Sequence, residues 1–138
     1  MTSTLSQDFT RKDSLRGELT PFRTCYDVTF YNLNVIIDEK EKSIEQSFND
    51  IHFIVKSDFQ RIQIDLALNM KIIFIQFENQ KLNYTREFDA VFINFPRELK
   101  AGEELKIKIW YNGHPRKAVN APWDGGFSWK KDKNNNPW

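Results

Sequence analysis

The chain has 138 residues, of which 40% are hydrophobic and 14% aromatic, and a chain of this length can enclose one core without disulfides. Its 20 Lys and Arg residues nearly balance its 19 Asp and Glu residues, which excludes the basic footprint of a nucleic-acid-binding domain. No apolar run approaches the roughly 20 residues that cross a bilayer, so no transmembrane segment is expected.

The first residues are polar and carry no pattern. Residues 1–16 mix Ser, Thr, Asp and Arg, and we expect a poorly ordered tail there. The stretch from Met1 to Thr10 has neither the basic nor the apolar region of a signal peptide. The expectation is therefore a chain without a secretory signal at this end.

The side chains able to ligate a metal or act as nucleophiles are few and scattered. Cys25 is the single cysteine, and we expect a buried or half-buried thiol on a strand. His52 alternates with apolar neighbours and should face solvent from a strand, whereas His114 lies in a Gly-His-Pro turn. A catalytic zinc needs three protein ligands in close geometry. We therefore expect neither a catalytic residue nor a metal ligand in this chain.

From residue 26 onward the sequence has the period of two that is typical of β-strands. Tyr31, Leu33, Val35 and Ile37 recur with this period, whereas Val28 and Phe30 are out of phase, so a bulge or bend is expected near residue 31. A charged hairpin tip is expected over 38–42, because a helix there would have no apolar face. Further strands are expected at 44–56, 62–66, 73–77, 90–95 and 105–111, and another is expected to begin at residue 82. Pro96 is expected to close the strand at 90–95.

About seven strands with short polar turns predict an all-β fold. No segment has a sustained period of 3.6, so a parallel sheet would lack its crossover helices. The prediction is an antiparallel, saddle-shaped β-sandwich or curved open sheet, forming a single domain over 17–138.

Residues 112–138 differ from the rest and are predicted to form a long aromatic-rich loop at the end of the domain. The loop contains three of the four tryptophans. Pro122 restricts φ, Gly125 and Gly126 permit conformations closed to other residues, and Asp124 can accept hydrogen bonds from backbone amides of its own turn. The loop could cover a sheet edge, dock on another domain or protein, or stack on a sugar. The residues assigned to this interdomain or binding loop are Pro122, Trp123, Asp124, Gly125, Gly126, Phe127, Trp129 and Trp138.

Several short segments, in this order, carry a family resemblance: 19–23, 26–28 with Tyr31, 62–66, 95–96, 111–115, 121–127, 129–132 and 136–138. Together they resemble the N-terminal β domain of the zinc aminopeptidase family that includes aminopeptidase N and leukotriene hydrolase, in its bacterial branch. The resemblance runs from about residue 16 to the end, and the Pro-Trp-Asp-Gly-Gly-Phe string is its most specific part. One departure is the run Asn134 to Asn136, where the family would have a turn glycine; Asn also tolerates the left-handed conformation.

The resemblance implies a fragment of a larger enzyme. In the family this domain packs on a thermolysin-like catalytic domain that binds zinc through an HExxH motif and a further Glu, beside a GxMEN loop. Neither motif occurs in this sequence, and the Gln or Glu that binds the substrate amine would follow Trp138. The implied role is a non-catalytic domain of a peptidase that removes N-terminal residues from peptides. Zinc, peptide substrates and a periplasmic or envelope location would belong to the parent enzyme, and the partner would be its catalytic domain.

Two other functions remain open at this point. The chain could be a free-standing β-sandwich module that binds carbohydrate or protein through Trp123, Phe127 and Trp129. It could also be an adhesion or assembly domain that presents an open strand edge. An HExxH motif in the sequence that follows would decide for the peptidase.

Overall fold

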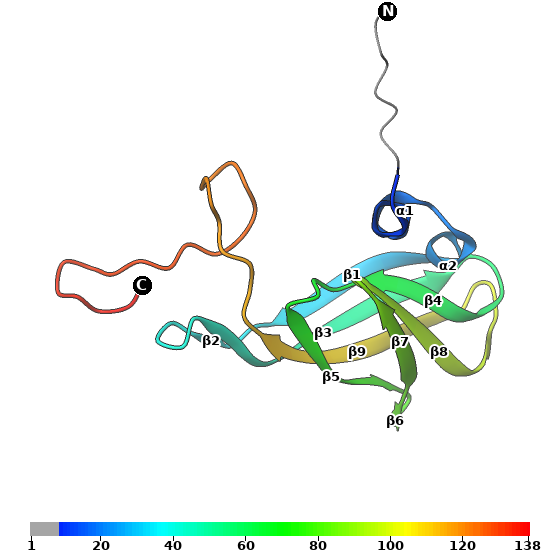
Figure 1. The fold of residues 1–138 in the computed structure, drawn as a ribbon. Coiled ribbons are helices and arrows are strands. Elements are labelled where there is room, and N and C mark those ends of the chain that lie inside the picture. Colours follow the sequence, from blue (N-terminus) through cyan, green and yellow to red (C-terminus); the bar gives the residue numbers. More distant parts are fainter. Residues whose placement is uncertain (1–8) are drawn as a thin grey trace, which may run out of the picture.

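A computed structural model describes residues 9–138, in which two short helices and nine strands follow one another (Figure 1). The helices are α1 (Arg11–Gly17) and α2 (Pro21–Thr24). The strands are β1 (Tyr26–Asn34), β2 (Ile37–Asp38), β3 (Ser43–Val55), β4 (Phe59–Asp65), β5 (Met70–Phe77), β6 (Gln80–Lys81), β7 (Asn83–Glu87), β8 (Ala90–Leu99) and β9 (Glu104–Gly113).

The strands form two open antiparallel sheets. Sheet A has six strands in the order β1-β3-β9-β5-β6, with β2 also paired to β3, and sheet B has three in the order β4-β8-β7. Strand accounts for 54% of the structure and helix for 8%, which confirms the predicted all-β antiparallel fold. Among residues 9–138 no helix has the length and apolar character needed to cross a membrane.

The core lies between the two sheets and follows from the alternation of the strands. Ile51 of β3 pairs with Ile107 of β9, and both side chains point inward with Phe53. The facing side of sheet B contributes Ile62 and Ile93, which pair with each other across β4 and β8. The buried cluster is Cys25, Ile51, Phe53, Val55, Phe59, Ile62, Ile64, Ile75, Phe77, Leu82, Val91, Ile93, Phe95, Leu99, Ile107 and Ile109.

Register shifts interrupt the strands, and one of them was expected. The predicted bulge near residue 31 is confirmed by a shift between Val28 and Phe30. A shift in β5 between Ile72 and Phe74 was missed. It leaves Ile73 exposed while Ile75 is buried.

We expected strand β8 to stop at Pro96, but it continues to Leu99. The pairing of β4 with β8 shifts between Phe59↔Leu99 and Arg61↔Asn94, so Pro96 lies opposite a break in the ladder. A proline is tolerated there because its missing N–H removes no ladder hydrogen bond.

The charged segment 38–42 is a hairpin tip, as predicted. Ile37 pairs with Ile44 and Asp38 with Ser43, which brings β2 against the start of β3. The Asp38 carboxylate accepts hydrogen bonds from the amides of Lys40 and Glu41, both at 2.9 Å. Such hydrogen bonds from backbone amides to a side chain stabilise turns and compete with helix formation.

The described part of the predicted N-terminal tail is folded, which corrects the expectation for 11–16. Helix α1 begins at a capping box between Thr10 and Asp13, and its Leu15 is buried against Ala90 and Phe92 of β8. The buried Gln63 amide donates to the Leu15 carbonyl at 2.9 Å. A single apolar side chain, Leu15, in the seven residues of α1 gave too little periodicity to predict this helix. The remainder of the predicted tail, 1–8, lies outside the described residues.

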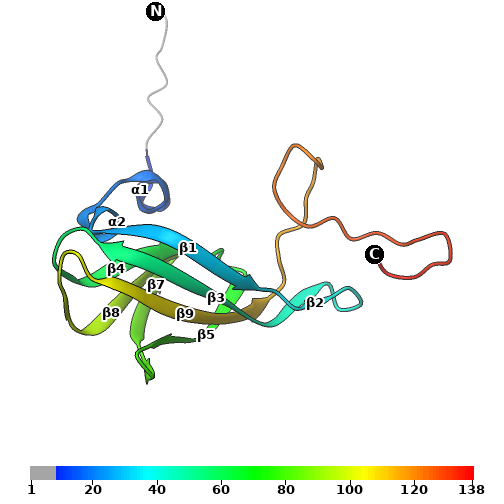
Figure 2. The ribbon, with the colours of Figure 1, turned by 180° about the vertical axis from the view of Figure 1, so that it is seen from behind.

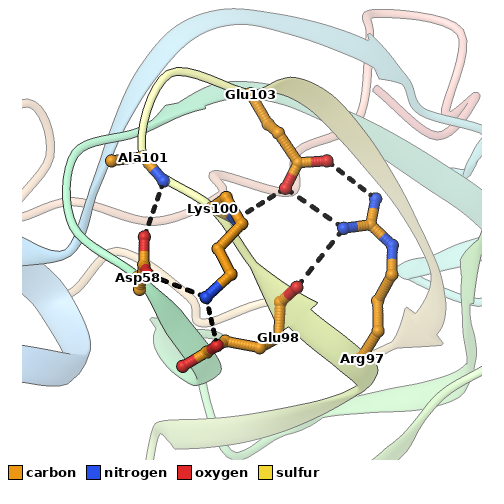
Figure 3. Close-up of polar contacts among 6 residues, drawn as sticks. All are labelled: Asp58, Arg97, Glu98, Lys100, Ala101 and Glu103. Carbon is orange, nitrogen blue, oxygen red and sulfur yellow. Dashed lines mark hydrogen bonds and ion pairs between the residues drawn. The ribbon is translucent and has the colours of Figure 1, made fainter.

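An ion-pair network ties the β3–β4 turn to the β8–β9 turn (Figure 3). The Asp58 carboxylate accepts from the Ala101 amide and the Lys100 ammonium, both at 2.9 Å. Lys100 also pairs with Glu98, and Arg97 with Glu103. These charges are solvated, and exposed pairs contribute little to stability, so we assign the network the role of holding two turns together. It lies at the start of β9, away from the chain's C-terminal segment.

Candidate functional site

Residues 114–138 form an arm that leaves β9 and extends away from both sheets (Figures 1 and 2). We call it the aromatic arm. Asn112 and Gly113 of the predicted loop are the last residues of β9. Beyond them the described residues have only isolated bridges, Lys117↔Phe127 and Lys131↔Pro137. These bridges close the arm into two successive lobes.

The first lobe is closed by backbone hydrogen bonds and by Asp124. The Phe127 amide donates to the Arg116 carbonyl at 2.8 Å, and the Ala118 amide donates to the Phe127 carbonyl at 3.0 Å. The Asp124 carboxylate accepts from the amides of Val119 and Asn120, at 2.5 Å and 2.7 Å. These amide hydrogen bonds, that from Val119 foremost, lower the pKa of Asp124. The lobe thus has a defined shape although it contains no strand pair.

The second lobe repeats this construction with Asp132. Lys130 and Trp138 exchange two backbone hydrogen bonds, at 2.6 Å and 2.7 Å. The Asp132 carboxylate accepts from the amides of Asn134 and Asn136 and from the Asn136 side chain, and the side-chain bond is the main cause of the lowered pKa of Asp132. Asn135 has φ of 67°, so an asparagine does take the left-handed turn position where a glycine was expected.

The four aromatic side chains of the predicted loop divide into two pairs. Trp123 is 89% exposed and Trp138 is 76% exposed. Phe127 and Trp129 are half-buried and stack on each other, with ring centroids 5.3 Å apart and planes 20° apart. Phe127 also packs against Ile44, Met70 and Tyr111 at the end of sheet A. Phe127 is therefore the anchor of the arm, whereas Trp123 and Trp138 present their rings to solvent.

The two acidic residues of the arm are both used inside it, so its free charge is positive. Asp124 and Asp132 cap the two lobes, and Arg116 lies 3.8 Å from Asp124. The four lysines of the arm are exposed: Lys117, Lys130, Lys131 and Lys133. A surface of exposed tryptophan beside lysine favours a partner whose facing side is apolar with an acidic rim.

The two glycines of the first lobe should respond differently to substitution by alanine. A Cβ at Gly126, where φ is 137°, would lie 2.7 Å from the Arg116 carbonyl oxygen and 2.8 Å from the Ala118 nitrogen. A Cβ at Gly125 would meet nothing within 4 Å. We expect Gly126→Ala to open the lobe and Gly125→Ala to leave it closed. Amide hydrogen exchange of Ala118 and Phe127 measures this, and equal protection in both variants would contradict the described geometry.

Beside the root of the arm, the inner face of sheet A continues past the end of sheet B and forms a groove of about 540 Å³. Its apolar lining includes Tyr31, Leu33, Ile44, Ile51, Ile109 and Tyr111. Arg23 and Asp65 form an ion pair of 2.7 Å on its border, and Pro115 and Arg116 of the arm also line it. The groove and the arm are therefore parts of one continuous surface.

The groove was not predicted from the sequence. It arises because β3 has 13 residues whereas β4, β8 and β7 of sheet B have 7, 10 and 5, so sheet B covers only part of sheet A. At the border, the Tyr26 hydroxyl donates to the Gln63 carbonyl at 2.8 Å, and burial raises the pKa of Tyr26 to about 12. The available signal was the apolar alternation of Tyr31 and Leu33, which continues into a region with no facing strand.

The residues able to ligate a metal lie apart. Cys25 is buried, but it ends α2 instead of lying on a strand, and burial raises the pKa of its thiol. His52 is half-buried on β3 with its ring against Phe30 at 5.4 Å, whereas His114 is exposed after β9. Within residues 9–138 there is no group of three His, Cys, Asp or Glu side chains that could hold an ion. The residues present do not fit a zinc site.

No family model and no curated protein matches the sequence. Solved structures do share the fold. The M1 zinc metallopeptidase from Deinococcus radiodurans has a TM-score of 0.60 at 21% identity, over 68% of this chain and 21% of that chain. A mutant of the same enzyme with a Tyr-Ser-Ala substrate also gives 0.60 at 21% identity, over 72% and 22%. A two-domain M1 zinc metallopeptidase with bound L-arginine gives 0.61 at 19% identity, over 80% and 27%.

These comparisons establish a likeness of fold at low sequence identity. The chain spans about a fifth to a quarter of the length of the structures it matches. What those enzymes bind and cleave is a property of the longer chains.

Proposed function

We propose that the chain is the non-catalytic N-terminal part of a zinc-dependent aminopeptidase, which removes N-terminal residues from peptides. In this proposal the aromatic arm and the neighbouring groove pack on the catalytic domain of the same polypeptide and help to shape it. The zinc and the peptide substrate are held by that domain, since the described residues of this chain do not fit a zinc site.

The observation that carries the proposal is the shared fold with M1 zinc metallopeptidases, of which the chain covers only a part. The arm supports it independently. Trp123 and Trp138 are large and exposed, and burying such a side chain at an interface contributes about 1.5–3 kcal/mol. The Pro-Trp-Asp-Gly-Gly-Phe string that resembles the family forms the first lobe, so the most specific sequence match and the exposed surface coincide.

The alternative of a free-standing binding module receives less support from the loop geometry. Phe127 and Trp129 stack on each other, so one face of each ring is already in contact. Trp123 is 89% exposed and stacks on neither Phe127 nor Trp129. The three side chains proposed for a sugar therefore do not form one flat platform.

The chain by itself is expected to bind no stoichiometric zinc and to release no amino acid from aminoacyl substrates. The reason is that a catalytic zinc requires three protein ligands in close geometry. Metal analysis of the purified chain and an aminopeptidase assay measure both properties. One zinc per chain together with turnover would contradict the proposal.

The reading frame of the encoding gene separates the peptidase from the binding module. We expect an HExxH motif with a further Glu about 150 residues or more beyond Trp138, a spacing estimated from common domain sizes. A reading frame that ends without this motif would contradict the peptidase proposal and favour the binding module.

A further inference from the structure

Strand β1 is an edge of sheet A, and beyond its bulge between Val28 and Phe30 it carries no charged side chain. It pairs with β3 on one side, and no strand of the described residues lies on its other side. From Val28 to Ile37 the sequence has no charged residue, no proline and no glycine. Phe30 and Leu33, at 58% and 60% exposed, are large apolar side chains in this stretch. Such an edge offers unpaired backbone groups together with apolar surface.

The side chains of β1 are exposed on both faces of the sheet. Phe30 lies opposite His52 on the outer face, whereas Tyr31 and Leu33 lie opposite Ile51 and Asn49 on the face of the groove. A strand added to the free edge would bring its side chains to about 4.5–5.5 Å from those of β1. It would therefore cover apolar surface on both faces at once.

The other edges of the described sheets are protected. Strand β6 has two residues and covers only the end of β5, whose remaining edge carries Lys71 and has its Met70 carbonyl bonded to Arg86. Strand β7 has five residues, including Arg86 and Glu87. Strand β4 contains Arg61 and Asp65 and has α2 packed against it. Short length, charge and a covering helix are the devices that keep a sheet edge from pairing. The one charged residue of β1, Asp27, lies at its start, and residues 28–34 have none of these devices.

We propose that β1 pairs with the β1 strand of a second copy of this chain, antiparallel about a two-fold axis. The partner strand should be uncharged and alternately apolar along a free edge, and residues 28–34 of β1 combine these three properties. A formal net charge of +1 produces little repulsion between two copies. An antiparallel pair of identical strands is self-complementary, as a two-fold interface requires. The inference does not depend on the proposed function.

The test compares Leu33→Lys with the matched variant Leu68→Lys. Leu68 is 59% exposed, against 60% for Leu33, but lies in the turn between β4 and β5. Sedimentation of the full chain over a range of concentrations should show a dimer for the wild type and for Leu68→Lys. Lysine at position 33 should raise the dissociation constant of the dimer about tenfold or more, because a charge on the edge opposes strand pairing.

A second measurement keeps the test valid if Leu33→Lys does not fold. In the wild-type chain, the amides of residues 28–34 that face the free edge should gain protection from hydrogen exchange as the protein concentration rises. A wild-type chain that is monomeric at every concentration would overturn the proposal. A dimer that survives Leu33→Lys, or one that Leu68→Lys also dissociates, would place the contact elsewhere and overturn it as well.

Discussion

Replacing Phe53 by alanine is expected to lower the free energy of unfolding by about 3–5 kcal/mol, the usual cost of removing a buried aromatic ring. Phe53 is 1% exposed. Its ring lies 5.8 Å from that of Tyr26 and 6.3 Å from that of Phe95, so it connects both sheets. Since a domain of this size is commonly stable by about 5–15 kcal/mol, the loss should be visible directly in urea denaturation.

Phe9→Ala is the matched control for this experiment. It removes the same ring from a position ahead of α1, where the side chain is 82% exposed, and surface substitutions usually change stability by about 0.5 kcal/mol or less. Equal losses in the two variants would mean that the core does not lie between the two sheets as described.

In the proposed parent enzyme, Trp123→Ala is expected to lower peptidase activity about tenfold or more while zinc content stays unchanged. The Trp123 side chain is 89% exposed, so its ring is available to a partner. Tryptophans buried at interfaces often contribute 2 kcal/mol or more, and about 1.4 kcal/mol corresponds to a factor of ten. Activity on an aminoacyl substrate, thermal stability and metal content are the three measurements.

Phe88→Ala and Phe127→Ala serve as comparisons for Trp123→Ala. Phe88 is an exposed aromatic residue in the β7–β8 turn, away from the arm, and its loss should leave activity unchanged. Phe127 anchors the arm on Ile44, Met70 and Tyr111, so its loss should release the arm and increase amide exchange there. Unchanged activity and stability in Trp123→Ala would remove the exposed ring from the proposed interface.

The alternation of apolar side chains was sufficient to predict the fold class and much of the sheet. Ile51, Phe53 and Val55 of β3, and Ile107 and Ile109 of β9, are buried as the period of two indicates. In a strand the side-chain direction repeats every two residues whatever the strand packs against, so this information is local.

The conformation of turns is equally local and could also be predicted from the sequence. Asp38 caps the predicted hairpin tip, Asp124 caps the first lobe of the arm, and Asn135 adopts a left-handed conformation. Each depends on the covalent structure of a few consecutive residues. The end of β8 could not be read from Pro96 in the same way. A proline ends a strand only where the neighbouring strand would require a backbone N–H at that position.

Three features were decided by contacts between distant segments. Leu15 is buried because β8 offers Ala90 and Phe92, and this packing orders a helix whose own sequence is mostly polar. Phe127 is an anchor and Trp123 is exposed, although the two lie four residues apart in one motif, because only Phe127 reaches the end of sheet A. The groove exists because β3 is longer than the strands of sheet B that face it. Sequence period determined which side chains share a face, whereas the tertiary structure alone decided which faces are covered, because burial depends on the length and position of the opposing element.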